Sequence, residues 1–145
     1  MLQPVAYTED WNLNERRAVA AKICDGLQRG CLAFAAAQAN RIVGFAYVDR
    51  TFFGNKHRYV ALEELYVSQP FRNRGIGRQL FVNACSGARS LGATRLYISA
   101  HSAEEVIAAY RRFGCEYAEE INQTLAEKEP CDLQLAFNLE THIPH

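Results

Sequence analysis

The sequence has no excess of charge of either sign, because lysine and arginine number 16 together and so do aspartate and glutamate. A protein that attracts nucleic acid through its overall field needs a net positive charge. We therefore expect no nucleic-acid partner. Any site for an anion must be built from a local cluster of basic residues.

Long apolar runs are also missing. The longest, CLAFAAAQA at 31–39, is far shorter than the roughly 20 apolar residues that cross a bilayer as a helix. The first ten residues, MLQPVAYTED, show neither the basic nor the apolar segment of a secretory signal. We therefore expect a cytoplasmic protein with no membrane partner.

The five cysteines include no CxxC pair, and an odd number cannot pair completely. Neither a disulfide framework nor a zinc site is indicated, so we expect buried thiols, a reducing compartment and no metal. No repeat, linker or low-complexity tract divides the chain, and hydrophobic residues make up 49% of it. Residues 1–145 are therefore expected to form a single domain with its own core.

Hydrophobic periodicity predicts hairpins first and alternating strands and helices later. Expected strands lie at 4–11, 31–38, 41–52, 58–68, 94–100, 115–119 and 132–140, the last in the edge region of the sheet. Expected helices lie at 14–30, at 75–91, and between a capping box of Ser102 with Glu105 and a stop at Gly114. This order predicts an α/β sandwich with a mixed sheet.

One expected strand ends in a loop rich in arginine and glycine, QPFRNRGIGRQLF at 69–81. Backbone N–H groups at the start of a helix have no partner within the helix, and the helix dipole adds positive charge there. Gly75 and Gly77 have no Cβ to obstruct an approaching group, while the arginines add forked donors. The loop therefore predicts a phosphate or pyrophosphate site. A surface turn with incidental arginines is the alternative.

Two common phosphate motifs do not fit this loop. Leu80 stands where the dinucleotide fingerprint needs its third glycine, and the Gly-Lys-Ser/Thr of a P-loop is missing. The pattern R-x-x-G-x-G formed by Arg72, Gly75 and Gly77 instead resembles the acetyl-CoA-binding motif of the GNAT superfamily of N-acyltransferases. LEELYVSQPFRNRGIGRQLF is similar to the central strand, loop and helix of that family. LYISAHSAEEVIAAYRRFGC is similar to its next strand and helix.

The resemblance implies an α/β fold with a mixed, mostly antiparallel central sheet that splays in the middle, and helices on both faces. It implies an enzyme that moves acetyl from acetyl-CoA, its co-substrate, to a primary amine without a metal. By resemblance, backbone groups pair with the pantetheine arm at Leu65, Tyr66 and Val67. The pyrophosphate would be held at Arg72, Asn73, Arg74, Gly75, Ile76, Gly77 and Arg78.

The resemblance also assigns catalytic roles. Tyr110 matches the tyrosine that protonates the departing CoA thiolate and is the candidate general acid. A core residue is the alternative, although a tyrosine can be both. The amine needs a base, for which Glu63 and Glu64 are the candidates. Strict alternation would turn one toward the cleft and the other toward a helix layer or solvent, and a bulge would reverse which one. Similarity of LEELYV to diamine acetyltransferases favours Glu63; ion-paired strand residues are the alternative for both.

The sequence leaves the acceptor open. Glu63, Glu64, Glu104 and Glu105 would suit a small cationic amine if they lie near the cleft. A protein or peptide amine acetyltransferase and a non-catalytic acyl-CoA-binding sensor are the alternatives. The family resemblance is also compatible with a homodimer through the last strand.

Overall fold

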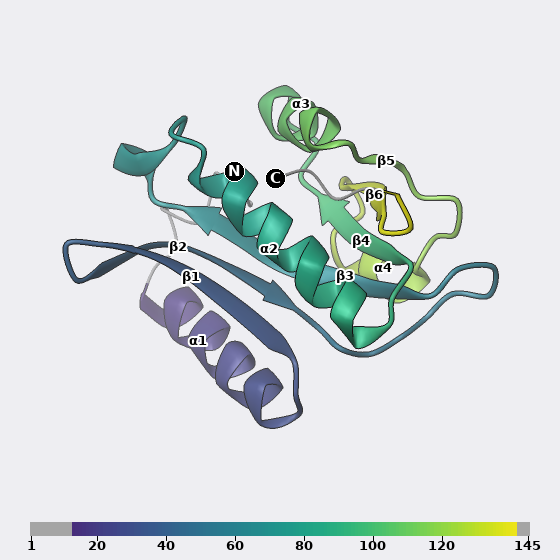
Figure 1. Cartoon of the computed structure of the whole chain (residues 1–145), viewed down its shortest axis with the longest axis horizontal. Helices are drawn as coiled ribbons and strands as arrows, with labels where there is room; N and C mark the ends of the chain where they lie inside the picture. Colours follow the sequence, from purple (N-terminus) through teal and green to yellow (C-terminus); the bar gives the residue numbers. More distant parts are fainter. Residues whose placement is uncertain (1–12, 142–145) are drawn as a thin grey trace.

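The computed structural model describes residues 13–141, which form a twisted sheet with helices on both faces (Figure 1). The elements in chain order are α1 (Leu13–Gln28), β1 (Leu32–Gln38), β2 (Arg41–Val48), β3 (Tyr59–Val67), η2 (Gln69–Phe71), α2 (Ile76–Leu91), β4 (Arg95–Ala100), α3 (Glu104–Phe113), β5 (Glu116–Tyr117), α4 (Gln123–Lys128) and β6 (Leu133–Asn138).

The sheet has six strands in the order β1-β2-β3-β4-β6-β5. β3 and β4 run parallel, and the other neighbours run antiparallel. The β3–β4 pairing extends only from Tyr59↔Arg95 to Ala61↔Tyr97, although both strands continue beyond it. The two central strands therefore diverge, and the expected mixed, mostly antiparallel sheet with a central splay is confirmed.

The helices cover opposite faces. A side chain at Gly44 of β2 would meet Leu80 of α2, whereas Tyr47 of the same strand lies against Gly26 of α1. Because strand side chains alternate and these two positions differ by an odd number, α1 and α2 lie on opposite faces. α3 lies with α2, since aromatic rings of the two helices are in contact. Figure 1 shows α2 lying across the strands.

The core forms between the sheet and the apolar face of α2. The buried residues of α2 recur at helical spacing, and they are Leu80, Phe81, Ala84, Cys85 and Ala88. Leu96, Tyr97 and Ile98 of β4 are buried on both faces of the sheet, as their apolar run predicts for a central strand. This packing fixes the start of α2 relative to the end of β3.

Two expectations about local structure are wrong. The last strand, β6, lies between β4 and β5 rather than at the edge, because the two-residue β5 pairs outside it. Ser102 does not cap α3, since the N-cap is Ala103, whose side chain accepts no hydrogen bond. The N–H of Ala103 instead donates to Nδ1 of His101 at 3.1 Å, so this histidine shapes the loop before α3.

The sequence reading did not anticipate α4. Its N-cap is Asn122, whose Oδ1 accepts a hydrogen bond from the N–H of Leu125 at 3.1 Å. The expected strand at 4–11 lies outside the described residues. Among the residues that the structure describes, no helix is long and apolar enough to cross a membrane.

Candidate active site

The loop after β3 presents the start of α2 without a side-chain cap. Gly75 is the N-cap, with φ 82° in the left-handed region that favours glycine. A Cβ added to Gly75 would meet no atom within 4 Å, so this backbone faces open space. Arg74 and Arg78 beside it are exposed. Unpaired N–H groups, the helix dipole and two guanidinium groups therefore surround a space that suits an anion.

Arg72 also holds this loop in shape. Its Nε donates a hydrogen bond to the carbonyl oxygen of Val67 at 2.8 Å, which ties the loop to the end of β3. Asn73 has φ 63°, a second left-handed residue in the turn. The guanidinium of Arg74 lies 5.6 Å from the centroid of the Phe71 ring. The arginines of the motif thus have structural roles besides the charge they contribute.

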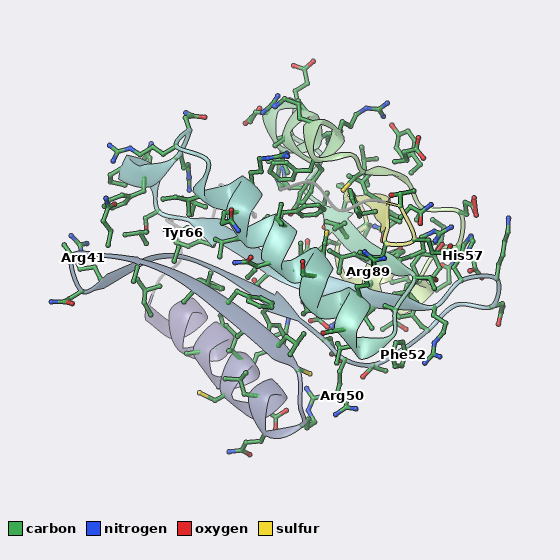
Figure 2. The ribbon with its side chains drawn as sticks, in the orientation of Figure 1. Arg41, Arg50, Phe52, His57, Tyr66 and Arg89 are labelled. Carbon is green, nitrogen blue, oxygen red and sulfur yellow. The ribbon has the colours of Figure 1, made fainter. Side chains whose placement is uncertain are left out.

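The edge of β3 that faces the splay continues from Leu62 to Val67 beyond its pairing with β4. On the other edge, Leu65, Tyr66 and Val67 pair with β2. Tyr66, labelled in Figure 2, lies at the end of the sheet where α2 begins. The three residues proposed to pair with a pantetheine arm therefore lead directly to the loop at 68–75, the proposed anion-binding loop.

A bulge in β3 places both candidate bases on the same side of the strand. Tyr47 of β2 pairs with Glu64 while Val48 pairs with Leu62, so Glu63 is an extra residue in β3. Glu63 and Glu64 line the same cavity. The expectation that one of them points away from the cleft is wrong, because the bulge interrupts the alternation on which it rested.

Lys22 of α1 joins the two carboxylates. Its Nζ lies 2.6 Å from Oε1 of Glu63 and 3.1 Å from Oε2 of Glu64. Burial raises the pKa of Glu64, against the opposing charge of Lys22. Burial alone would lower the pKa of Lys22, but the charge of Glu64 and the contact with Glu63 outweigh it, and that pKa is raised. The ammonium and its carboxylate partners therefore form a charged cluster inside the cleft.

The cavity opens where β3 and β4 diverge and has a volume of about 310 Å³. It lies on the α1 face of the sheet, where α4 closes its other side. The lining residues are Val19, Lys22, Ala61, Leu62, Glu63, Glu64, Ser99, Leu125, Lys128, Glu129 and Asp132. Four of these are acidic and two are lysines. The cavity therefore carries an excess of negative charge.

The other acidic candidates lie elsewhere. Glu104 and Glu105 occupy the first turn of α3 and are not among the residues that line the cavity. The acidic residues that line the cavity besides Glu63 and Glu64 are Glu129 and Asp132. His57 and Phe52 belong to the connection between β2 and β3. Figure 2 shows them at the opposite end of the sheet from Tyr66, so this connection lies far from the loop before α2.

Asp132 belongs to a chain of hydrogen bonds that the sequence did not reveal. Its Oδ2 accepts from Oγ of Ser99 at 3.1 Å, and Ser99 in turn accepts from Nε2 of Gln134 at 3.0 Å. The hydroxyl of Tyr97 donates to Oε1 of Gln134. Burial raises the pKa of Asp132, although the hydrogen bond from Ser99 opposes this. Ser99 and Asp132 are thereby held at the wall of the cavity.

Tyr110 is 3% exposed, and its ring packs against Phe81 and Phe113. Burial raises the pKa of its hydroxyl well above the usual value, with smaller contributions from the charges of Cys115, Glu64 and Asp132. Two of those groups line the cavity, so Tyr110 lies within electrostatic reach of it from the α3 side. Tyr110 is therefore a core residue, and carboxylates that line the cavity contribute to the raised pKa of its hydroxyl.

The arrangement is a splayed sheet with the proposed anion-binding loop at one end and an acidic cavity beside it. The sequence matches the acetyltransferase (GNAT) family over residues 2–115, more than half of the chain. The chain belongs to the GNAT acetyltransferase family. It is therefore an enzyme of the acyltransferase class.

Solved structures share this GNAT fold. A GNAT family acetyltransferase from Elizabethkingia anophelis with acetyl-CoA bound is 16% identical, with a TM-score of 0.62 over 83% of this chain and 82% of that chain. The PaiA N-acetyltransferase from Thermoplasma acidophilum in complex with coenzyme A is 13% identical, with a TM-score of 0.66 over 91% and 82%. Nourseothricin acetyltransferase is 23% identical, with a TM-score of 0.59 over 74% of this chain and 64% of that one. A search of curated proteins gave no match.

Proposed function

We propose that this GNAT enzyme transfers the acetyl group of acetyl-CoA to a primary amine of a small cationic molecule. One observation carries the proposal. The cavity at the splay is lined by two adjacent carboxylates, Glu63 and Glu64, on the same strand that leads into the anion-binding loop. A base for the amine and a site for the cofactor's phosphates are thus joined by a few residues of β3.

The residues of the loop fit acetyl-CoA, which would supply the reactive thioester. The open space at Gly75 leaves the backbone of α2 accessible to a pyrophosphate, and Arg74 and Arg78 add positive charge. The splay-facing edge of β3 at Leu65, Tyr66 and Val67 would offer backbone groups to the pantetheine arm. An N–H from this edge would also stabilise negative charge that develops on the thioester oxygen.

The carboxylate pair is proposed to remove the proton that the ammonium of the acceptor must lose before attack. Because burial raises the pKa of Glu64, this group is a stronger base than an exposed glutamate. Of the two carboxylates, Glu63 lies closer to the ammonium of Lys22, with its Oε1 2.6 Å from Nζ. The base is one of these two residues, and the variants E63Q and E64Q identify it by the larger loss of kcat.

Tyr110 is proposed as the acid that protonates the departing thiolate. The hydroxyl of a tyrosine is protonated at neutral pH, as an acid must be, and burial further disfavours the ionised form by raising its pKa. Its ring is fixed by Phe81 and Phe113, which limits its rotation. The packing that makes Tyr110 look like a core residue is therefore compatible with an acid held in one place.

The size and charge of the cavity favour a small cation as acceptor. A volume of about 310 Å³ is at the lower end of the range for small-molecule sites, roughly 300–1,000 Å³. The excess of carboxylates would attract positive charge and disfavour anionic amines. A peptide acceptor is the competing function that an experiment must separate from this one.

The test is a screen of acceptors with detection of free CoA thiol. We expect turnover with small di- and triamines, at least about tenfold faster in kcat/KM than with neutral or acidic amino compounds of similar size. Faster turnover with lysine peptides would favour a protein acetyltransferase. Binding of acetyl-CoA without turnover on any amine would contradict transfer to an amine. Preference for neutral or anionic amines would contradict the cationic acceptor.

A further inference from the structure

The lysines of this chain are unevenly placed. They are Lys22, Lys56 and Lys128, and two of them line the acceptor cavity. Lys56 lies in the loop between β2 and β3, where its side chain is 70% exposed and pairs with Glu119. Because lysine side chains carry primary amines, the cavity already contains the chemical group that this enzyme is proposed to acetylate.

Lys22 places its amine beside the proposed base. Its Nζ contacts Glu63 at 2.6 Å and Glu64 at 3.1 Å, the two groups proposed to remove a proton from the substrate. Its side chain is 38% exposed, so it is not enclosed by the core. Lys128 has the same functional group and lines the same cavity, but its relation to Glu64 is a longer-range electrostatic one. Lys22 is therefore the lysine already engaged with the base.

We propose that Lys22 is a site of self-acetylation, and that the enzyme acetylates its own Nζ when acetyl-CoA is bound and no external amine fills the cavity. This inference rests on the proposed function, since it uses the same acceptor cavity and the same base. The inference goes beyond the proposed function by assigning a modification site and a second activity to the chain. External acceptor and Lys22 would then compete for one position.

The reaction balances in atoms and charge. The Nζ ammonium of Lys22 gives one proton to the Glu63–Glu64 pair, and the neutral nitrogen attacks the thioester carbonyl carbon. The new C–N bond forms and the C–S bond breaks. The nitrogen then loses its second proton, which replaces the one that Tyr110 gives to the thiolate, while the proton on the carboxylate pair passes to solvent. The thiolate leaves and is protonated to CoA thiol, with Tyr110 as the proposed donor. One acetyl-lysine, one CoA thiol and one proton released to solvent result, with no oxidation or reduction.

Acetylation would change the cavity. The modified Lys22 would have no positive charge, so Glu63 and Glu64 would lose the partner that now neutralises part of their charge. The added acetamide would also occupy space in a cavity of about 310 Å³. We therefore expect the acetylated enzyme to have a lower kcat/KM for external amines than the unmodified one.

The experiment incubates the purified full chain with isotopically labelled acetyl-CoA and no acceptor, and follows each lysine by peptide mass spectrometry. We expect label on Lys22 at a rate on the order of a hundredfold above that of Lys56, which reports chemical acetylation. The rate should be first order and independent of protein concentration, because donor and acceptor belong to one molecule. A saturating external amine should suppress it.

Two variants complete the test. K22R keeps a positive charge near the carboxylates and should leave Lys56 and Lys128 at the chemical background. Gly75→Leu, which obstructs the anion-binding loop, should reduce labelling of Lys22 to that background.

Three results would each overturn the inference: label on Lys56 or Lys128 at the rate of Lys22, a labelling rate proportional to protein concentration, or label on Lys22 that persists in Gly75→Leu. Turnover of external amines with Lys22 unlabelled would overturn it and leave the proposed function intact, whereas failure to bind acetyl-CoA would overturn both.

Discussion

At the scale of single residues, Tyr110 is a core residue for which we also propose a catalytic role. Its ring is part of the core and its hydroxyl is coupled to charges that line the cavity. Removal of the hydroxyl alone should leave the packing nearly unchanged, because phenylalanine has the same ring. The residue therefore allows the catalytic role to be separated from the structural one.

We predict that Tyr110→Phe lowers kcat about a hundredfold while the affinity for acetyl-CoA stays within about twofold, since a general acid typically contributes at least that factor. The matched control is Tyr59→Phe, because the hydroxyl of Tyr59 is also buried and its ring packs against Phe53, His57 and Tyr97. Steady-state kinetics should show a wild-type kcat for this control. Equal rates in both variants would remove Tyr110 from the mechanism.

Residue positions were predictable from the sequence only where a motif names them. Tyr110, Gly75 and the arginines belong to such a motif. Lys22 belongs to no such motif. It follows Val19 by three residues and so shares its helix face, but a lysine among apolar residues is only a weak signal of a functional role. Asp132 and Ser99 meet only through the pairing of β4 with β6, a contact between residues distant in sequence that no local pattern encodes.

At the scale of elements, the bulge in β3 and the turn before α2 decide the geometry of the site. The period of two in β3 would separate Glu63 from Glu64, and the bulge brings them together on one cavity wall. A bulge depends on how β2 pairs with β3, so the alternating pattern of β3 alone could not predict it. The elements themselves were predictable because their apolar periods are long, whereas the short α4 was not.

We predict that Gly75→Leu weakens binding of acetyl-CoA at least about tenfold, because the side chain would fill the open space in front of the α2 N-terminus. The left-handed φ of 82° adds a loss of stability of about 1–2 kcal/mol. Gly92→Leu is the matched control. Gly92 has φ 102° at the other end of α2, so a leucine there would meet similar backbone strain away from the loop.

Calorimetric titration and thermal unfolding separate these two effects. Both variants should lose a similar amount of stability, and only Gly75→Leu should lose affinity. If Gly92→Leu weakens acetyl-CoA binding as much, the loss comes from strain in α2 and the assignment of the loop is wrong.

At the scale of the whole molecule, the site exists because two halves of a sheet separate. β1, β2 and β3 pair continuously on one side, and β4, β6 and β5 on the other, with three pairs of residues joining β3 to β4. A splay of this kind lets a ligand contact both halves at once. A ligand bound along it should therefore stabilise the folded chain as a unit, and this gives the most direct test of the cofactor.

We predict that acetyl-CoA at a hundredfold excess over its Kd raises the free energy of unfolding by about 2.7 kcal/mol, because it binds the folded state alone. For a chain of this size the midpoint of thermal unfolding should rise by on the order of 10 °C. NADH and ATP at the same concentration are the controls, since each offers phosphates without a pantetheine arm.

A shift with acetyl-CoA alone would mean that both the loop and the splay-facing edge of β3 contribute to binding. Equal shifts with all three ligands would mean that the loop binds phosphate without selecting the arm, and the assignment of Leu65 to Val67 would then be wrong. A shift with NADH or ATP but none with acetyl-CoA would contradict the cofactor itself.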